Sequence, residues 1–533
     1  MALALMAGLP GSLDKASSAL GLSEKKQAGT HLINYFSKPC KPTKVNGGRT
    51  RNLPEHNPEK WEDFKVYCIQ DVEVERAISR KLHGFMFPAF EKRLWDLDQK
   101  INDRGVKVDT ALIDHAMACD DYISTKLMAS AQALTGLVNP NSVTQLKGWV
   151  EEQTGEAPAS LNKDTVQEML KNIDCPVVLE ALNLRLQLAK ASVKKYAAMK
   201  SATCEDGRVR GLLQYYGANR TGRWAGRLVQ VQNLRRNNLP DLDMARDILL
   251  SGDYELLEVL YGDVPDVLSQ LIRTAFIPSE GRQFIVSDFS AIEARVIAWL
   301  AGEKWRLDVF ASHGKIYEAS AAHMFNVPLE DVDKELRQKG KVAELALGYQ
   351  GGAGALIKMG ALDMGLTEDE LPELVAAWRS SNPAIVRLWK EVEGAAKKAV
   401  QNQTVVDFRY GIVFVYDSGN LLIRLPSGRN LVYQNAAIGI GEKGFPQITY
   451  SGVNQTTRKW EKTETYGGKL VENVVQAIAR DCLAEALIAV DDAGYNIAMH
   501  IHDEVATQDF THTICHSARF GYFVKNIPRA ANV

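Results

Sequence analysis

Two acidic segments lie far apart in the sequence. One directly follows an expected strand, and the other lies at the turn between two expected strands. The short apolar run Arg282–Ser287 leads directly into Asp288, after which a helical pattern begins. Near the end of the chain, Tyr495–Thr507 alternates as two strands around a tight turn that carries His502-Asp503-Glu504. Taken singly, Asp288 is more simply explained as a helix N-cap, and Asp503 as an ordinary turn acid.

Taken together, the two aspartates predict a metal site. Carboxylates from separate strands can hold two Mg²⁺ ions about 4 Å apart, which activate an attacking hydroxyl and stabilise the leaving oxygen. Magnesium prefers oxygen ligands and keeps substrate phosphates in its coordination shell. Asp288 and Asp503 therefore indicate chemistry on a phosphate-bearing substrate.

A helical stripe of another kind precedes Gly351-Gly352, which we expect to end the helix. Arg337, Lys341, Leu345 and Tyr349 recur every four residues and so share one helix face. The two cations can grip a triphosphate, and Tyr349 offers a surface on which a base can stack. Without the acidic pair, a solvated basic face would be the simpler interpretation.

The segment from Asn219 to Arg236 is basic and polar. It contains Arg223, then Gln232 and Asn233, and ends in two further arginines. Arginine interleaved with Gln, Asn and Gly suits contacts to phosphates and to minor-groove acceptors. A basic surface loop without a partner explains the segment equally well.

Helical patterns dominate the rest of the chain, whose 533 residues suggest about three to four domains. Helices are expected at 61–82, over several segments of 94–200 that include Val178–Met199, over 312–400 and at 473–490. A loop is expected over 38–60, and short strands over 404–450.

Composition excludes several classes of protein. No uncharged apolar stretch approaches ~18 residues, and the apolar N-terminus lacks the basic residues of a signal peptide. The 7 cysteines form no C-x-x-C pair, which argues against a zinc site or a disulfide framework and fits a reducing cytosol. The net charge of -2 gives no sign of a nucleic-acid partner, but nucleic-acid binding depends on where the basic residues lie rather than on the net charge. These features indicate a soluble intracellular protein.

Four motifs in order resemble the bacterial DNA polymerase I family (family A). Asp288-Phe289-Ser290-Ala291-Ile292-Glu293-Ala294-Arg295 resembles its first palm motif, the stripe from Arg337 to Tyr349 its fingers helix, and His502-Asp503-Glu504 its last palm motif. Thr221-Gly222-Arg223 with Gln232-Asn233 resembles its T-G-R…Q-N segment. The run Glu472–Asp481 is similar to that of phage members. The resemblance covers roughly residues 100–505.

The resemblance implies an α+β right-hand polymerase, with an antiparallel palm sheet, helical fingers and thumb, and an N-terminal remnant of an RNase H-like exonuclease domain. We expect the partial exonuclease-like domain at 1–95, thumb and connecting helices at 96–210, the first part of the palm at 211–308, fingers at 309–440, and the second part of the palm with an atypical tail at 441–533.

The resemblance also assigns catalytic and nucleotide-binding roles. Asp288 and Asp503, with the Phe289 carbonyl, would bind two Mg²⁺ ions, with Mn²⁺ as an alternative. Arg337 and Lys341 would hold the incoming deoxynucleoside triphosphate, and Lys341 would supply a proton to the leaving pyrophosphate. In the same comparison, Tyr349 would guard the templating position, and Glu293 would block a ribose 2′-hydroxyl.

Primer–template DNA is the expected partner. Arg223 and Gln476 would contact minor-groove acceptors near the primer end, His502 would lie by the primer terminus, and Gln232 and Asn233 belong to the same DNA-binding segment. The implied function is template-directed primer extension, for phage DNA replication in the host cytoplasm. No membrane is involved, and a separate processivity factor is left open.

Three departures from the family pattern stand out. Leu345 occupies the place of a Phe or Tyr, which weakens stacking on the nucleotide sugar, and Gln350 replaces the Gly that follows the fingers tyrosine. The third departure is the end of the chain, because 508–533 does not resemble the family's closing segment. We interpret it as a shifted reading frame or a truncation.

Tyr67 and Asp71 resemble the third motif of the family's 3′–5′ exonuclease domain, but the partner acidic motifs have too little room upstream. We therefore expect no proofreading by this chain alone. Two alternatives stay open: a single-subunit RNA polymerase, against which Glu293 argues, and a catalytically impaired remnant that only binds primer–template DNA.

Overall fold

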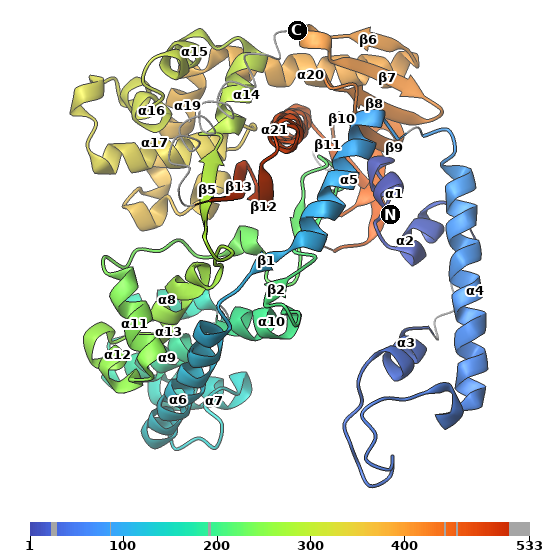
Figure 1. Ribbon diagram of the computed structural model, residues 1–533. Helices are drawn as coiled ribbons and strands as arrows, with labels where there is room; N and C mark the ends of the chain where they lie inside the picture. Colours follow the sequence, from blue (N-terminus) through green and yellow to red (C-terminus); the bar gives the residue numbers. More distant parts are fainter. Residues whose placement is uncertain (23–28, 86, 190–192, 442–443, 455–456, 511–533) are drawn as a thin grey trace.

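Helix α21 (Gly467–Asp492) runs through the middle of the molecule and is surrounded on several sides (Figure 1). It packs against helices α20, α14 and α5 and against strand β12. The computed structural model describes residues 1–22, 29–85, 87–189, 193–441, 444–454 and 457–510. The helix expected at 473–490 is thus confirmed, and it begins earlier than its apolar pattern indicated.

A three-stranded antiparallel sheet lies beside α21 and has the strand order β12-β13-β5. Its strands are β5 (Arg282–Asp288), β12 (Asn496–Ile501) and β13 (Glu504–Phe510). The expected strand before Asp288 and the expected terminal hairpin are both confirmed. Strand β13 pairs with both neighbours, so two segments more than 200 residues apart become one sheet.

A second antiparallel sheet has six strands in the order β11-β10-β9-β8-β7-β6. They are β6 (Val405–Asp407), β7 (Val413–Asp417), β8 (Asn420–Arg424), β9 (Asn430–Ile440), β10 (Pro446–Val453) and β11 (Trp460–Thr465). The expected domain boundary at 440 falls between β9 and β10, which pair with each other. The boundary therefore cuts through one sheet, because a local pattern does not reveal which strands pair.

Seven helices follow β5 and precede β6 in the sequence. They form one helical group at the upper left of Figure 1 and along the six-stranded sheet. They are α14 (Ile292–Ala301), α15 (Lys304–Ala311), α16 (Ile316–Phe325), α17 (Lys334–Leu347), α18 (Ala353–Lys358), α19 (Leu371–Ser381) and α20 (Pro383–Asn402). All of them except α15 contribute to one hydrophobic core that they share with the six-stranded sheet and with α21. Burial of such a continuous apolar core is the main force that holds these elements together.

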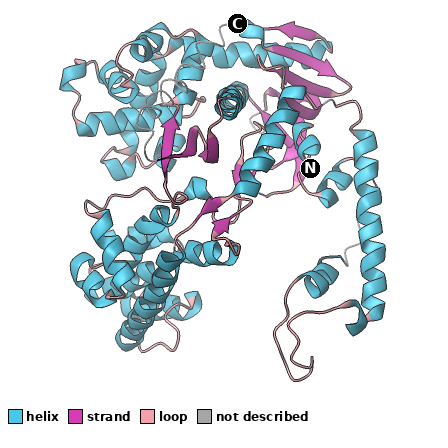
Figure 2. Ribbon diagram, viewed as in Figure 1, coloured by secondary structure: helices cyan, strands magenta, loops and turns pink. Residues whose placement is uncertain are grey.

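A helical lobe lies at the lower left of Figure 1 and is almost free of strands in Figure 2. It contains α6 (Thr110–Thr135), α7 (Val143–Thr154), α8 (Lys163–Asn172), α9 (Pro176–Leu188), α10 (Lys194–Ala202), α11 (Leu242–Ser251), α12 (Tyr254–Tyr261) and α13 (Val264–Leu271). The single helix expected over Val178–Met199 is wrong, since α9 ends at Leu188 and α10 begins at Lys194. Helices α11 and α13 pack against α6, although they fall within the range expected for the first part of the palm.

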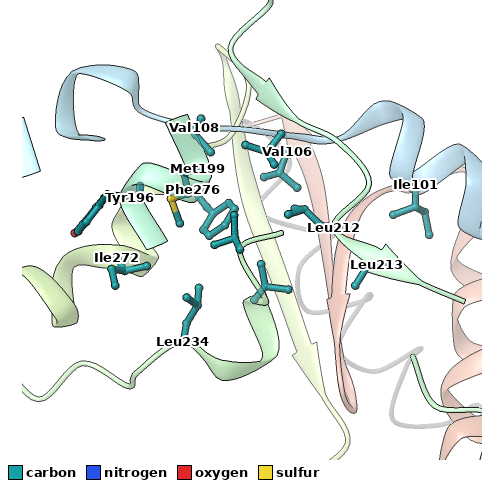
Figure 3. Packing of buried hydrophobic residues seen from close by; sticks show 14 of the residues in the cluster. Ile101, Val106, Val108, Tyr196, Met199, Leu212, Leu213, Leu234, Ile272 and Phe276 are labelled. Carbon is teal, nitrogen blue, oxygen red and sulfur yellow. The ribbon is translucent and has the colours of Figure 1, made fainter. Parts of the chain in front are cut away.

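The lobe joins the central sheet through one hydrophobic core (Figure 3). Tyr196 and Met199 of α10 lie in this core with Ile272, Phe276 and Leu212, and the Tyr196 hydroxyl donates to the Leu268 carbonyl at 2.8 Å. Short strand pairs brace the junction: β1 (Val106–Lys107) with β2 (Arg208–Val209), and β3 (Leu213–Gln214) with β4 (Ala225–Gly226). The base of the lobe is therefore anchored beside the sheet that carries the acidic residues.

The N-terminal region is helical in its described part. It contains α1 (Ala2–Met6), α2 (Leu13–Ala19), α3 (Gly29–Ser37), α4 (Pro58–Lys81) and α5 (Ala89–Arg104), and no strand lies within the described residues before 105. Helix α5 lies against α21, whereas α4 runs along the right-hand edge of the molecule (Figure 1). The helix expected at 61–82 is confirmed. Across the described ranges, no helix is both long and apolar enough to cross a membrane.

Candidate active site

The β12–β13 hairpin brings Asp503 beside Asp288. The hairpin turns through His502 and Asp503, and Glu504, the first residue of β13, pairs directly with Asp288, the last residue of β5. The Phe289 N–H donates to the Asp503 carbonyl at 3.0 Å, which extends the pairing past the strand end. Both predicted acidic segments therefore lie at one end of one sheet.

The local backbone around this sheet end is unusual. His502 and Ala291 have φ values of 56° and 52°, in the left-handed region that non-glycine residues seldom occupy. Ala291 is the N-cap residue of α14, and no side chain caps that helix. The interpretation of Asp288 as a simple helix N-cap is therefore wrong. Strained backbone of this kind often occurs at functional sites.

The carboxylates at this end of the sheet repel one another. Burial and, after it, the charge of Asp288 raise the pKa of Asp503 to about 6. The pKa of Asp288 is raised by burial and partly lowered by Arg236, and the pKa of Glu504 is raised by burial and by Asp288. A cation bound between the carboxylates would relieve this repulsion, so the site has the charge and the oxygen donors that a divalent ion needs.

The interpretation of this sheet end as a metal site rests on Asp288 and Asp503 alone. In the described part of the chain, no three or more His, Cys, Asp or Glu side chains form a ready-made metal-ligand group. Magnesium is commonly bound by one or two carboxylates, with substrate phosphates and water as its remaining ligands. The residues present fit an ion whose coordination is completed by the substrate.

Glu293, in the first turn of α14, connects three other predicted site residues. Its Oε1 accepts from Arg223 Nη1 at 3.0 Å, and its Oε2 accepts from the Tyr349 hydroxyl at 2.9 Å. Arg223 Nη2 lies 3.2 Å from His502 Nδ1. Burial and the charge of Glu293 hold the pKa of Tyr349 well above its ordinary value, so its hydroxyl stays a donor. The structure thus links Tyr349, Glu293, Arg223 and His502 in one chain of contacts.

A hollow opens where these contacts meet the acidic hairpin. It is lined by Arg223, Trp224, Ile292, Glu293, Ala479, Arg480, His500, His502 and Asp503. Buried His500 stacks edge-on against Trp224, and its pKa is lowered to about 3 by burial and by Arg480. The imidazole is therefore neutral at ordinary pH.

The Thr221-Gly222-Arg223 segment is held by α21. Gly222 has a φ of 79°, and an added Cβ would lie 2.6 Å from Arg429 Nη1, so a side chain at this position is excluded. Its carbonyl accepts from Arg480 Nε at 3.1 Å. The Arg220 guanidinium lies over the rings of Tyr433 and Tyr450, 4.6 Å from each centroid. These contacts fix the backbone from which Arg223 reaches Glu293.

The predicted fingers stripe is only partly a helix face. Helix α17 ends at Leu347, so Tyr349 lies in the following turn, and the expected helix end at Gly351-Gly352 is wrong. The turn is fixed by contacts distant in sequence, which the four-residue period cannot show. Arg337, on α17, is paired with Glu318 at 2.8 Å, Lys341 is half-buried, and Leu345 is 50% exposed.

Buried polar contacts hold α17 in place. Glu344, between Lys341 and Leu345, forms an ion pair with Arg306 of α15 and accepts from Ser320 of α16 at 2.7 Å. Trp378 of α19 donates to the same carboxylate at 3.1 Å. The basic side chains of α17 are therefore carried on a rigid support.

Three DNA-binding candidates remain, and one of them contacts the hairpin through His502. Gln232 is in a single 3₁₀ turn, η3 (Val231–Asn233), and its backbone hydrogen-bonds to the His502 side chain. The Asn233 amide donates to Gln230 at 3.3 Å, and the Gln476 amide donates to Glu472 at 3.3 Å.

Two groups were not singled out from the sequence. Arg236 lies close enough to lower the pKa values of both Asp288 and Glu504, and Glu472 is close enough to Glu293 to have its own pKa raised by that charge, after burial. Arg236 belongs to the basic segment already noted, so its position in that run was the available signal. Glu472 begins the run Glu472–Asp481 that resembles phage members, but nothing in that run indicated that its carboxylate lies near Glu293.

Comparison with known proteins identifies this arrangement. The sequence model described as DNA polymerase family A matches residues 121–513, well over half of the chain. The chain belongs to DNA polymerase family A.

A curated relative supports the same assignment at high identity. The chain is 61% identical over 501 residues to the DNA polymerase of Bacillus phage SP02, a match that covers 93% of this chain and 77% of the relative. The thermostable DNA polymerase I of Thermus aquaticus is 33% identical over 124 residues, which is only 14% of that protein. The family A member described here is thus a phage-type DNA polymerase.

A solved structure agrees in fold. The POL domain of Pol1 from M. smegmatis, in complex with DNA primer–template and dNTP, aligns with a TM-score of 0.60 and 16% identity, covering 99% of this chain and 78% of that chain. At this identity the likeness concerns the fold, which is the expected α+β polymerase fold. As a family A enzyme, this chain is a template-directed DNA polymerase that uses divalent metal ions.

The predicted exonuclease residues lie elsewhere in this polymerase. Tyr67 is buried on α4, where its ring stacks on Phe64 with centroids 6.3 Å apart, and an added Cβ at Gly29 would overlap the Tyr67 ring. Asp71 is one helical turn further along α4. Helix α4 is separated from the sheet of β5, β12 and β13 (Figure 1). The packing of Tyr67 against Phe64 and Gly29 accounts for its burial.

Proposed function

We propose that this polymerase extends a primer 3′-hydroxyl with deoxynucleoside triphosphates through two Mg²⁺ ions held by Asp288 and Asp503, with Mn²⁺ as a substitute. The observation that carries the proposal is the pairing of Glu504 with Asp288, which sets Asp503 beside Asp288 at one sheet end. Bound there, the ions would polarise the primer hydroxyl and neutralise charge on the phosphates.

The protein's own side chains hold and orient the reactants. Arg337 and Lys341, both on α17, bind the triphosphate of the incoming nucleotide, and Lys341 donates a proton to the leaving pyrophosphate. Tyr349 and Glu293 form one wall of the sugar and base site, and Glu293 excludes a 2′-hydroxyl. Their hydrogen bond of 2.9 Å supports this joint role.

The primer end is held from the other side of the hollow. Arg223, Gln232, Asn233, Gln476 and His502 contact the DNA minor groove and the primer terminus, and Arg236 adds positive charge beside Asp288. The phage SP02 relative supports a role in phage DNA replication, which takes place in the cytoplasm of the host.

Primer extension tests the proposal. We expect Asp288→Asn and Asp503→Asn each to reduce extension by at least about 10³-fold while primer–template binding persists, because metal-dependent charge stabilisation is lost. Asp417→Asn is the matched control, because Asp417 is an exposed aspartate at another two-residue hairpin. Extension that survives in Asp288→Asn, or wild-type protein that binds primer–template but never extends it, would contradict the proposal.

A further inference from the structure

Gln350 adopts a backbone conformation that normally belongs to glycine. Its φ is 67°, in the left-handed region, and it directly follows Tyr349. A non-glycine residue pays an energetic cost to stay there. Contacts with the surrounding structure therefore have to hold this conformation.

That contact is made with the first turn of α21. The Gln350 side-chain oxygen accepts from the Gly468 N–H at 2.8 Å, and Glu393 of α20 accepts from the Gly467 N–H at 3.1 Å. The first N–H groups of a helix have no partner within the helix, and no side chain of α21's own N-cap residue, Tyr466, supplies one. Gln350 thus caps α21 from a turn that is 118 residues earlier in the sequence.

The turn and the helix are in backbone contact at this point. An added Cβ on Gly468 would lie 2.4 Å from the Gln350 Cβ and 2.4 Å from the Tyr349 carbonyl oxygen. Helix α20 also reaches this turn, because Trp389 Nε1 donates to the Gly348 carbonyl at 3.0 Å. The turn that carries Tyr349 is therefore held by both α20 and the N-terminus of α21.

We propose that Gln350 is a positioning residue for sugar selection: its hydrogen bond to Gly468 holds the Tyr349 hydroxyl against Glu293, and so keeps the wall that excludes ribonucleotides closed. The inference rests on the proposed function of Glu293. Glu293 has one carboxylate oxygen on Arg223 and the other on Tyr349, so movement of Tyr349 leaves the carboxylate held by Arg223 alone and freer to rotate. Gln350 touches neither Glu293 nor the acidic pair in this arrangement; it acts through Tyr349.

Two variants separate the hydrogen bond from the backbone. Gln350→Gly suits the left-handed conformation but removes the acceptor, whereas Gln350→Glu keeps an acceptor of the same length and adds a charge that a helix N-terminus favours. We expect the ratio of kcat/KM for a dNTP to that for the matching ribonucleotide to fall about 2- to 10-fold in Gln350→Gly, mainly through a lower KM for the ribonucleotide. Gln350→Glu should retain the wild-type ratio.

Hydrogen exchange of the ligand-free protein gives a readout that does not depend on catalysis. The Gly468 amide should exchange faster in Gln350→Gly and as slowly as in the wild type in Gln350→Glu. A wild-type ratio in Gln350→Gly, or equal changes in both variants, would overturn the proposal. If exchange responds as expected but wild-type protein extends no primer, the proposed function fails and the contact stands. If the wild-type enzyme extends primers but the Gly468 amide exchanges no faster in Gln350→Gly, the positioning contact is refuted and the proposed function stands.

Discussion

The Arg480 side chain of α21 and the Glu91 side chain of α5 form a buried, two-pronged ion pair, with Nη1–Oε1 and Nη2–Oε2 distances of 2.6 and 2.8 Å. Arg480 also donates to the Gly222 carbonyl, the residue before Arg223. Burial, the largest single effect, would raise the pKa of Glu91, but the charge and hydrogen bond of Arg480, the charge of Arg429 and the hydrogen bond from Tyr215 together outweigh it, and the pKa is lowered. The pair therefore supports the backbone of the Thr221-Gly222-Arg223 segment.

Removal of one partner of this pair should be costly. Glu91→Ala leaves Arg480 buried beside fewer acceptors, and we expect the free energy of unfolding to fall by about 3–5 kcal/mol, measured by urea denaturation. Glu62→Ala, which removes an exposed i,i+3 pair with Lys65, should cost about 0–1 kcal/mol. Equal losses in the two variants would show that the buried pair is not a support.

The raised pKa of Asp503 predicts the pH dependence of stability. Its folded-state pKa of about 6 lies above its ordinary value of 3.8, so the folded protein binds this proton more tightly than the unfolded chain does. Stability from this group is therefore fully present below the ordinary value and is lost as the pH rises through about 6. In EDTA at pH 8, Asp503→Asn should raise the midpoint of thermal unfolding.

The same titration affects ion binding. Protonated Asp503 is a poor metal ligand, so the affinity of the wild-type protein for Mn²⁺ should rise between about pH 5 and 7, with protons released on binding. Calorimetry in buffers of different ionisation enthalpy measures that release. Asp417→Asn should behave as the wild type in both experiments, and an unchanged melting midpoint in Asp503→Asn would contradict the raised pKa.

Much of this site was predictable because its signals are local. The strand before Asp288, the terminal hairpin and most of α17 were each predicted from short patterns, and each is confirmed. The roles of their side chains could be assigned only because four motifs occur in the order found in the family. A lone Asp is usually a cap or a turn residue.

The parts that could not be predicted depend on contacts between distant segments. No sequence pattern near Asp288 indicates that Glu504 pairs with it. Likewise, no pattern near Tyr349 shows that Trp389 and Gly468 fix the turn after α17. The packing of α11 and α13 against α6, and the pairing of β9 with β10 across residue 440, are of the same kind.

Lys341 offers a test of the proposed acid role. Lys341→Gln should lower kcat for primer extension by about 10²-fold or more, the range expected when a general acid is lost. The matched control is Lys339→Gln on the same helix, because Lys339 is engaged with Glu335 at 2.8 Å. Single-turnover incorporation kinetics separate the two, and a similar small loss in both variants would argue against proton donation by Lys341.

The Tyr349–Glu293 hydrogen bond predicts non-additive effects. Tyr349→Phe removes only the hydroxyl, and Glu293→Gln removes the charge and weakens the acceptor. Each should lower discrimination against ribonucleotides, and the double variant should lower it by less than the sum of the two free-energy changes, since one contact is lost in both. A double-mutant cycle on kcat/KM measures this coupling, and strict additivity would show that the hydroxyl and the carboxylate act independently.

Asp71 provides a test at the far side of the molecule. It lies on α4, next to the packing cluster of Tyr67 and Phe64, and belongs to no group of three acidic or histidine side chains within the described residues. Two-metal hydrolysis needs a clamp on both the attacking and the leaving oxygen, and we propose that Asp71 does not provide one. We therefore expect Asp71→Ala to leave any Mg²⁺-dependent shortening of a labelled 3′ end unchanged, while Asp288→Asn abolishes extension in the same assay. Shortening that disappears in Asp71→Ala would assign α4 to a nuclease site.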